Sequence, residues 1–225
     1  MSGAGAPSPR TRVRRLPDRA AYDDDTIAAI LDAGVVGHLG FVVDDQPYVI
    51  PMLHARVGAA IYLHGSPASR AMRVLSAGAR ACLTVTHLDG FVLARSAFHH
   101  SVNYRSVVVL GRAVEVTEPA EKMAALEAFM ERLTPGRWAE VRPPDARELK
   151  ATVVLRMDLG EASAKLRTGS PHDDEGDLAG SAWAGVVPIR MVAGPPDAAP
   201  DLAPGIAPSA AVTTLMKRFG AERGD

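Results

Sequence analysis

The sequence has a single cysteine, Cys82, among its 225 residues. One cysteine excludes an intrachain disulfide framework and a zinc site built from cysteine ligands. No uninterrupted apolar run approaches the ~20 residues that a membrane-spanning helix requires. The basic residues near the N-terminus are not followed by an apolar stretch, so we expect no secretory signal and a cytoplasmic protein.

The sequence also lacks an excess of charge of either sign. It has 25 basic and 26 acidic residues, which gives a formal net charge of −1 at pH 7. Proteins that coat nucleic acids or anionic membranes carry a large positive excess. We therefore expect neither nucleic acid nor a membrane as a partner. The hydrophobic fraction of 47% and the charged fraction of 23% are typical of a globular protein.

Several signatures of catalytic sites are missing as well. The sequence contains no Gly-x-Ser-x-Gly elbow, no Gly-x-Gly-x-x-Gly after an expected strand and no His-Glu-x-x-His motif. Cys82 lies in an apolar strand, where a buried and unreactive thiol is the usual state. The seven histidines lack the spacing of metal ligands, so we predict no metal site. A haem held by one histidine stays open, because a single axial ligand has no spacing signature.

The central part of the chain has the pattern of β-strands. Valine and threonine are frequent, and Asp44-Asp45-Gln46 and Leu88-Asp89-Gly90 have the composition of turns. Strands at short and regular spacing favour a meander that closes, or nearly closes, into a barrel. The expected fold class is mainly β with flanking helices, and the expected strands are residues 35–43, 47–54, 59–64, 80–87, 91–95, 104–117 and 151–159.

Four helices are expected around these strands. Asp23 can cap a helix that Gly34 ends. Ser66 is a good N-cap, and Pro67 would occupy the first helical position, which favours proline. The third helix has an apolar face that includes Met123 and Phe129. The expected spans are the segment between Tyr22 and Gly34, residues 66–75, residues 119–133 and Val212–Phe219.

Composition divides the chain into three parts. Residues 1–20 are rich in Gly, Ala, Ser, Pro and Arg, and we expect a disordered arm. Residues 21–193 form the expected folded domain. Residues 194–225 form a proline-rich tail with a possible short helix.

One segment has the arrangement of a phosphate site. The expected strand that ends at Leu63-His64-Gly65 is followed directly by a helix, whose first N–H groups attract anions. Ser69 and Arg70 would lie in the first turn and could close on the same phosphate. An ordinary capped helix with a solvated basic face explains the pattern equally well. Arg105 could likewise contact an anionic ligand or be a charge exposed at a strand end.

Taken together, several motifs resemble the pyridoxamine 5′-phosphate oxidase-like flavoproteins with an FMN-binding split barrel. Within these, the sequence is most similar to the Nim-type nitroimidazole-resistance proteins. The resemblance covers about residues 18–190, and the order and spacing of the motifs are more specific than any one of them. The motifs are Gly37-His38-Leu39-Gly40-Phe41-Val42, Pro47-Tyr48-Val49-Ile50-Pro51-Met52, Leu63-His64-Gly65-Ser66, Ser69-Arg70, Asp89-Gly90-Phe91-Val92-Leu93-Ala94-Arg95-Ser96, Asn103-Tyr104-Arg105-Ser106-Val107 and Trp183-Ala184-Gly185-Val186-Val187-Pro188.

The resemblance implies a six-stranded split barrel that forms a homodimer, with two FMN sites across the dimer interface. It places the FMN phosphate at Ser69 and Arg70. It places the flavin ring against the backbone of the second and third strands, and it adds contacts from the later strand and, at Trp183, from the other subunit. The implied cofactor-binding residues are Val49, Ile50, Met52, Leu63, His64, Gly65, Ser66, Ser69, Arg70, Arg105, Ser106 and Trp183.

The function that the resemblance implies is an FMN-dependent oxidoreductase. It would be a flavin reductase or a nitroreductase-like enzyme that acts on a small planar substrate. The histidine near the flavin in Nim-type proteins corresponds to His64, which is therefore the candidate catalytic residue. The further basic and polar residues of the vitamin-oxidising members are missing, so that reaction is not assigned. The alternatives are a deazaflavin-dependent reductase, a non-catalytic flavin- or haem-binding protein, and a barrel that has lost its ligand.

Overall fold

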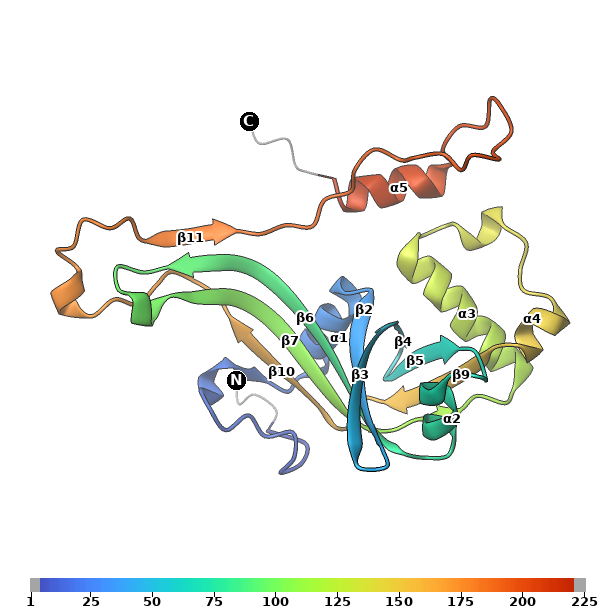
Figure 1. Ribbon diagram of the computed structural model, residues 1–225, viewed down its shortest axis with the longest axis horizontal. Coiled ribbons are helices and arrows are strands. Elements are labelled where there is room, and N and C mark those ends of the chain that lie inside the picture. The colour runs from blue at the N-terminus through green and yellow to red at the C-terminus, as the bar shows by residue number, and fades with distance from the viewer. Residues whose placement is uncertain (1–4, 221–225) are drawn as a thin grey trace.

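The computed structural model describes residues 5–220, which form two antiparallel sheets flanked by helices (Figure 1). Within these residues the larger sheet has seven strands. Six follow one another as neighbours, and the seventh, β11, pairs with β6. In the order of the sheet they are β1 (Ala20–Ala21), β10 (Ala162–Arg167), β7 (Ser101–Arg112), β6 (Arg80–Leu93), β2 (Val36–Val43) and β3 (Gln46–Leu53), with β11 (Gly185–Pro188) beside β6.

The smaller sheet lies beside the end of the larger one at which α2 and α3 are found (Figure 1). Its order is β4 (Ala55–Val57), β5 (Ala60–Gly65), β9 (Val153–Asp158) and β8 (Val114–Glu115). The α-helices are α1 (Asp24–Ala33), α2 (Arg70–Ser76), α3 (Pro119–Leu133), α4 (Ala146–Lys150) and α5 (Ala210–Arg218). Short 3₁₀ turns lie at Pro17–Arg19, Ala97–His99, Trp138–Glu140 and Glu175–Asp177.

The mainly β fold with flanking helices is confirmed, and the arrangement is that of a split barrel whose sheet does not close. The main core contains side chains from both sheets and from α1 and α2. Four of its leucines are fully buried: Leu31, Leu39, Leu63 and Leu83. A second cluster lies under α3 around Phe129. The two clusters pack against opposite faces of β5, with Ile61 and Leu63 in the first and Ala60 and Tyr62 in the second. This packing holds β5 in position, and β5 carries His64, one of the expected flavin-binding residues.

The expected turn at Leu88-Asp89-Gly90 is wrong, because β6 continues through it. β7 pairs with β6 along its whole length, and the register shifts between Leu88 and Gly90. Such a shift marks a β-bulge, which bends a strand without ending it. A Cβ atom on Gly90 would lie 2.9 Å from the carbonyl oxygen of Val187 in β11. The glycine therefore permits close approach of a third strand rather than a reversal of the chain.

The helix that the sequence places at residues 66–75 begins later than expected. α2 starts at Arg70, and Ser69 occupies the N-cap position. Ser66 instead forms a turn, since its carbonyl oxygen accepts from the Ser69 N–H at 2.9 Å and its Oγ accepts from the Ala68 N–H at 3.2 Å. Pro67 lies within this turn and not in the first turn of the helix.

The other helices follow the sequence signals more closely. Asp23 caps α1, and its Oδ1 accepts from the Thr26 N–H at 2.8 Å. α3 has the expected bounds. α5 begins two residues before the expected Val212, because Ser209 caps it. None of the helices in residues 5–220 is long and apolar enough to cross a membrane.

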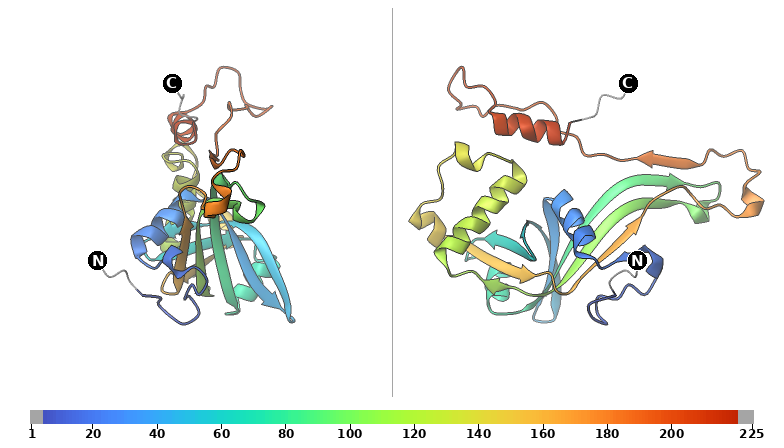
Figure 2. Two further views of the ribbon diagram at one scale, coloured as in Figure 1. Left: turned by 90° about the vertical axis from the view of Figure 1, so that its left-hand side faces the viewer. Right: turned by 180° about the vertical axis from the view of Figure 1, so that it is seen from behind.

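Both terminal segments contact the rest of the chain. Near the N-terminus, Thr11 is 4% exposed, and the Val13 N–H donates to Tyr22 Oη at 2.9 Å. In the tail, the Ala193 N–H donates to the Phe219 carbonyl at 2.7 Å, so that β11, the following strand-like segment and α5 lie along one side of the molecule (Figure 2). The outer parts of the expected arm and tail, residues 1–4 and 221–225, lie outside the described residues.

Candidate functional site

The expected phosphate-binding residues lie where α2 meets β3. The Arg70 guanidinium carbon lies 4.6 Å from the centre of the Tyr48 ring, a cation–π distance. Ser69 is the N-cap residue of α2, but its hydroxyl makes no capping hydrogen bond. The Ser69 hydroxyl and the exposed Arg70 guanidinium are therefore on adjacent residues, and the hydroxyl does not cap the helix.

The strands beside this corner differ in how far their residues are exposed. Leu63 is fully buried, so only its backbone could contact a ligand. β4 pairs only with Ala60–Tyr62 of β5, which leaves Leu63–Gly65 beyond its end on that edge. Val49 of β3 is 68% exposed, whereas Ile50 and Met52 are half-buried against the core. The arrangement suits a flat ring that lies against backbone.

His64 lies on the other side of β5 from Leu63. Its ring contacts Phe129 of α3 edge to face, with the ring centres 4.4 Å apart. Burial lowers the pKa of His64, so the neutral imidazole is favoured at neutral pH. Its buried Nδ1 has no hydrogen-bond partner within residues 5–220. His64 and Arg70 thus contact different elements, and the structure does not bring their side chains together.

Arg105 and Ser106 are far from this corner within one protomer. Tyr48 pairs with Phe41, which pairs with Ala81 of β6, whereas Arg105 pairs with His87. Six residues separate Ala81 and His87, or about 20 Å at ~3.3 Å per residue. Trp183 precedes β11, which pairs still further along β6, and it is 65% exposed. The expected site residues therefore form two separate groups in one chain.

The second group borders a cavity that sequence reasoning missed. β2 pairs with Ala81–Thr84 of β6, and β11 pairs with Gly90–Leu93 on the same edge. The intervening residues 85–89 have no strand on that edge. A cavity of about 750 Å³ lies there, covered by the segment after β11 and the end of α5. We call it the edge cavity; it is lined by Ala33, Gly34, Val35, Val36, His38, Thr86, His87, Leu88, Asp89, Arg105, Ile189, Arg190, Met191, Val192, Arg218, Phe219 and Gly220.

The wall of the edge cavity is unusually apolar for an exposed surface. Five of its large hydrophobic side chains are at least 37% exposed, and Met191 is 77% exposed. Exposed apolar groups that gather around one concave surface are typical of a ligand site. The five residues are Val36, Leu88, Ile189, Met191 and Val192.

Two histidines line this cavity in different states. His87 Nε2 lies 2.9 Å from the Ile30 carbonyl oxygen, a hydrogen bond that requires the proton on Nε2. His38 is exposed on β2, and within residues 5–220 it forms neither a hydrogen bond nor an ion pair. His38 is therefore available to a ligand, whereas His87 is held by the end of α1.

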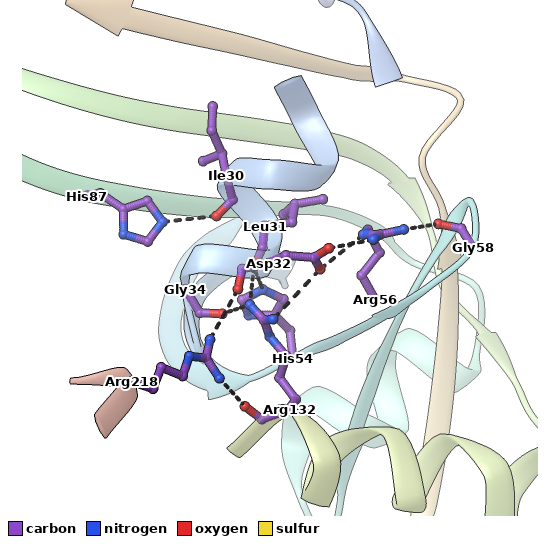
Figure 3. Close-up of polar contacts among 10 residues, drawn as sticks. All are labelled: Ile30, Leu31, Asp32, Gly34, His54, Arg56, Gly58, His87, Arg132 and Arg218. Atoms are coloured by element: carbon purple, nitrogen blue, oxygen red, sulfur yellow. Dashed lines mark hydrogen bonds and ion pairs between the residues drawn. The ribbon is translucent and has the colours of Figure 1, made fainter. Parts of the chain in front are cut away.

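Side chains from α3, from α5 and from the connection between β3 and β4 contact that end of α1 (Figure 3). Arg132 Nη2 donates to the carbonyl oxygens of Leu31 and Gly34 at 3.1 and 3.0 Å, and His54 Nε2 lies 3.1 Å from the Leu31 oxygen. Arg218 donates to the Asp32 carbonyl at 3.4 Å. α1 has no basic residue in its last turn, so Arg132 and Arg218 supply the positive charge that a helix C-terminus favours. These contacts hold in place the wall of the edge cavity that Ala33 and Gly34 form.

The comparisons with known proteins agree with this fold. The family model described as pyridoxamine 5′-phosphate oxidase matches residues 23–166. The flavocytochrome Anf3 from Azotobacter vinelandii is 42% identical, with 94% of this chain and 98% of that chain covered and a TM-score of 0.88. The FAD and heme binding protein from Mycobacterium smegmatis is 36% identical, with 88% and 97% covered and a TM-score of 0.85.

A 5-nitroimidazole antibiotic resistance protein from Bacteroides thetaiotaomicron shares the fold at 20% identity, with 65% and 85% of the two chains covered and a TM-score of 0.56. A search of curated proteins found no match. The family match spans more than half of the chain, and the two flavoprotein structures align over nearly all of it. The chain belongs to the pyridoxamine 5′-phosphate oxidase family.

Proposed function

We propose that the protein is an oxidoreductase that binds both a flavin and a haem and passes electrons between them. The observation that carries the proposal is the edge cavity, whose apolar wall includes a histidine without a partner among the described residues. Relatives at 42% and 36% identity are named as a flavocytochrome and as an FAD and heme binding protein. The proposal combines the flavin oxidoreductase with the haem binding that the sequence leaves open as an alternative.

The edge cavity fits a haem on three grounds. Its apolar side chains suit the faces of a porphyrin, and Arg218 supplies positive charge at its border, whereas the charge of Arg105 is already paired with Asp89. His38 offers an imidazole side chain without a partner among the described residues, and it would be the histidine ligand of the haem. His87 is the weaker candidate, because coordination through Nε2 would break its hydrogen bond to Ile30.

The flavin would occupy the corner of α2, β3 and β5. Ser69 and Arg70 hold its phosphate, and the backbone of Leu63–Gly65 contacts its ring. Arg105, Ser106 and Trp183 lie about 20 Å or more along β6, so they reach the same flavin only from a second protomer. We therefore propose a homodimer with shared flavin sites. The flavin is FAD or FMN, and the M. smegmatis relative, named for FAD, favours FAD.

When bound, the flavin supplies two-electron chemistry and the haem supplies one-electron chemistry, while the protein binds and orients them. The chain contributes a wall in which the carbonyl groups at the end of α1 already have donors, supplied by Arg132, His54 and Arg218. Burial lowers the pKa of His64, so the imidazole stays neutral at neutral pH. A small planar molecule remains the proposed substrate.

The haem assignment is tested by titrating hemin into haem-depleted dimer and recording the Soret band. His38→Ala should lose the band, or shift it to that of a haem without a histidine ligand. His100→Ala is the matched control, since His100 is exposed and its Nδ1 contacts only the Ser96 carbonyl oxygen. An unchanged spectrum and affinity in His38→Ala would exclude His38 as the ligand.

Loss of the Soret band in His87→Ala, but not in His38→Ala, would identify His87 as the haem ligand. Protein that binds flavin and takes up no haem would return the function to the flavin-only oxidoreductase. Protein that binds a deazaflavin but neither FMN nor FAD would favour the deazaflavin-dependent reductase.

A further inference from the structure

A buried arginine without an acidic partner among the described residues lies at the C-terminal end of β10. Arg167 is the last residue of β10 and is 7% exposed. Among residues 5–220 no carboxylate lies within ion-pair distance of its guanidinium. Burial of a cation without a counter-charge is strongly unfavourable, so such a group is normally paired with an anion.

The neighbours that hold the Arg167 guanidinium are neutral. Nη1 donates to Oδ1 of Asn103 and, at 3.4 Å, to the Gly169 carbonyl, and Nη2 donates to the Ser170 carbonyl at 3.3 Å. The Asn103 amide is itself fixed, because its Nδ2 donates to the Gly169 carbonyl at 3.2 Å. These bonds orient the guanidinium but leave its charge uncompensated.

A second arginine adds to the positive charge. Burial and the nearby charge of Arg19 both lower the pKa of Arg167. Arg19 ends the 3₁₀ turn Pro17–Arg19, and its side chain also forms no ion pair within the part of the chain that the structure describes. Two like charges held near each other are stabilised by an anion between them.

Arg19 and Arg167 both line a small cavity of about 230 Å³. Its size suits one oxyanion rather than a whole nucleotide. Asp18 is the one acidic residue in its lining; it is exposed and takes part in no ion pair among the described residues. The lining residues are Asp18, Arg19, Leu166, Arg167, Thr168 and His172.

We propose that this cavity is a phosphate-binding site in which Arg167 and Arg19 bind the oxyanion from two sides. A guanidinium fork matches the oxygen atoms of a phosphate, and the Thr168 and His172 side chains can complete the shell as donors. The phosphate is either a free anion or part of a nucleotide cofactor. The site shares no lining residue with the edge cavity, although Leu166 pairs with Arg105 of that cavity, and it requires neither cofactor assignment.

The experiment titrates inorganic phosphate into the purified dimer, with its cofactors bound, by isothermal calorimetry at constant ionic strength, with chloride as the competing anion. Wild-type protein should bind phosphate. Arg19→Gln should weaken that binding about tenfold, the effect of one charge-assisted hydrogen bond. Arg14→Gln is the matched control, because Arg14 is an exposed arginine on the same segment and lines no part of this cavity.

Flavin content of the same variants identifies the source of the phosphate. If Arg19→Gln keeps its flavin and loses phosphate binding, the site takes a free anion. If Arg19→Gln loses its flavin, and the flavin-loaded wild type binds no added phosphate, the site holds a cofactor phosphate. Phosphate binding and flavin content that are both unchanged in Arg19→Gln would overturn the proposal. The titration gives a result even if the protein proves to bind no haem.

Discussion

Arg105 of β7 and Asp89 of β6 form a bidentate ion pair at the bulge in β6. Arg105 Nε donates to Asp89 Oδ2 at 2.9 Å, and Nη2 donates to Oδ1 at 2.8 Å. The carboxylate raises the pKa of Arg105 further above its usual value. The pair lies at the border of the edge cavity, where it fixes both the bulge and the direction in which the guanidinium points.

Removing the charge of Asp89 should weaken this pair. Both side chains are about one-third exposed, so solvent screens the attraction. We expect Asp89→Asn to lower the free energy of unfolding by about 0.5–1 kcal/mol. Urea denaturation measures it, with Asp44→Asn in the β2–β3 turn as the control. A loss no larger than that of the control would show that the pair does not contribute to stability.

The expected phosphate-binding residues of the flavin corner predict a specific loss of cofactor. The Ser69→Ala, Arg70→Ala double variant should bind flavin at least about tenfold more weakly, since it removes a hydroxyl and a charged donor. Fluorescence quenching of added FMN and FAD measures the affinity. Arg73→Ala, one turn further along α2, is the control. Unchanged affinity in the double variant would contradict the assignment of Ser69 and Arg70.

One buried and one half-buried histidine predict a loss of stability in acid. Burial lowers the pKa of both His54 and His64, whereas the unfolded chain titrates at about 6.5. As the pH falls below about 6.5, the unfolded state takes up protons that the folded state does not, so stability decreases. Equilibrium unfolding at about pH 7.5 and about pH 5.5 should show this decrease.

His64→Gln separates the contribution of one histidine from that of the carboxylates. We expect its stability to depend less on pH over the same interval than that of the wild type. His100→Gln, at an exposed position, should follow the wild type. An equal pH dependence in all three proteins would show that His64 does not remain neutral in the folded state.

The arginine that closes α1 predicts a larger effect on stability. Arg132 Nη2 donates to two helix-end carbonyls, and its side chain is 16% exposed. Arg132→Met should lower the free energy of unfolding by about 1–3 kcal/mol, because the Gly34 carbonyl oxygen loses its donor and the Leu31 carbonyl oxygen keeps only His54. Denaturant unfolding measures the loss, and Arg147→Met on the exposed α4 is the control. A loss equal to that of the control would show that water replaces the guanidinium.

The sequence predicts the elements whose signals are local. α1 and α3 are found where expected, because Asp23 caps the first and Pro119 and an apolar stripe define the second. β10 was missed, since its residues Ala162–Arg167 have no β-branched side chain. It is held instead by pairing with β7 and β1. Tertiary pairing of this kind overrides weak propensity and is not visible in one segment.

The candidate site shows the same limit. The Asp-Gly pair in β6 favours a turn locally, but pairing with β7 and the approach of β11 extend the strand through it. The edge cavity forms in consequence, from segments as distant as His38 and Arg218. The corner of Ser69 and Arg70 lies within one short segment, and its residues could be proposed from the sequence alone.

The central claim is that one protomer holds both a flavin and a haem. The most direct measurement is the absorption spectrum of the purified dimer, with flavin and haem each quantified per protomer after release. We predict a Soret band together with flavin bands, and nearly one of each cofactor per protomer. A flavin spectrum with no Soret band, even after hemin is added, would contradict the claim.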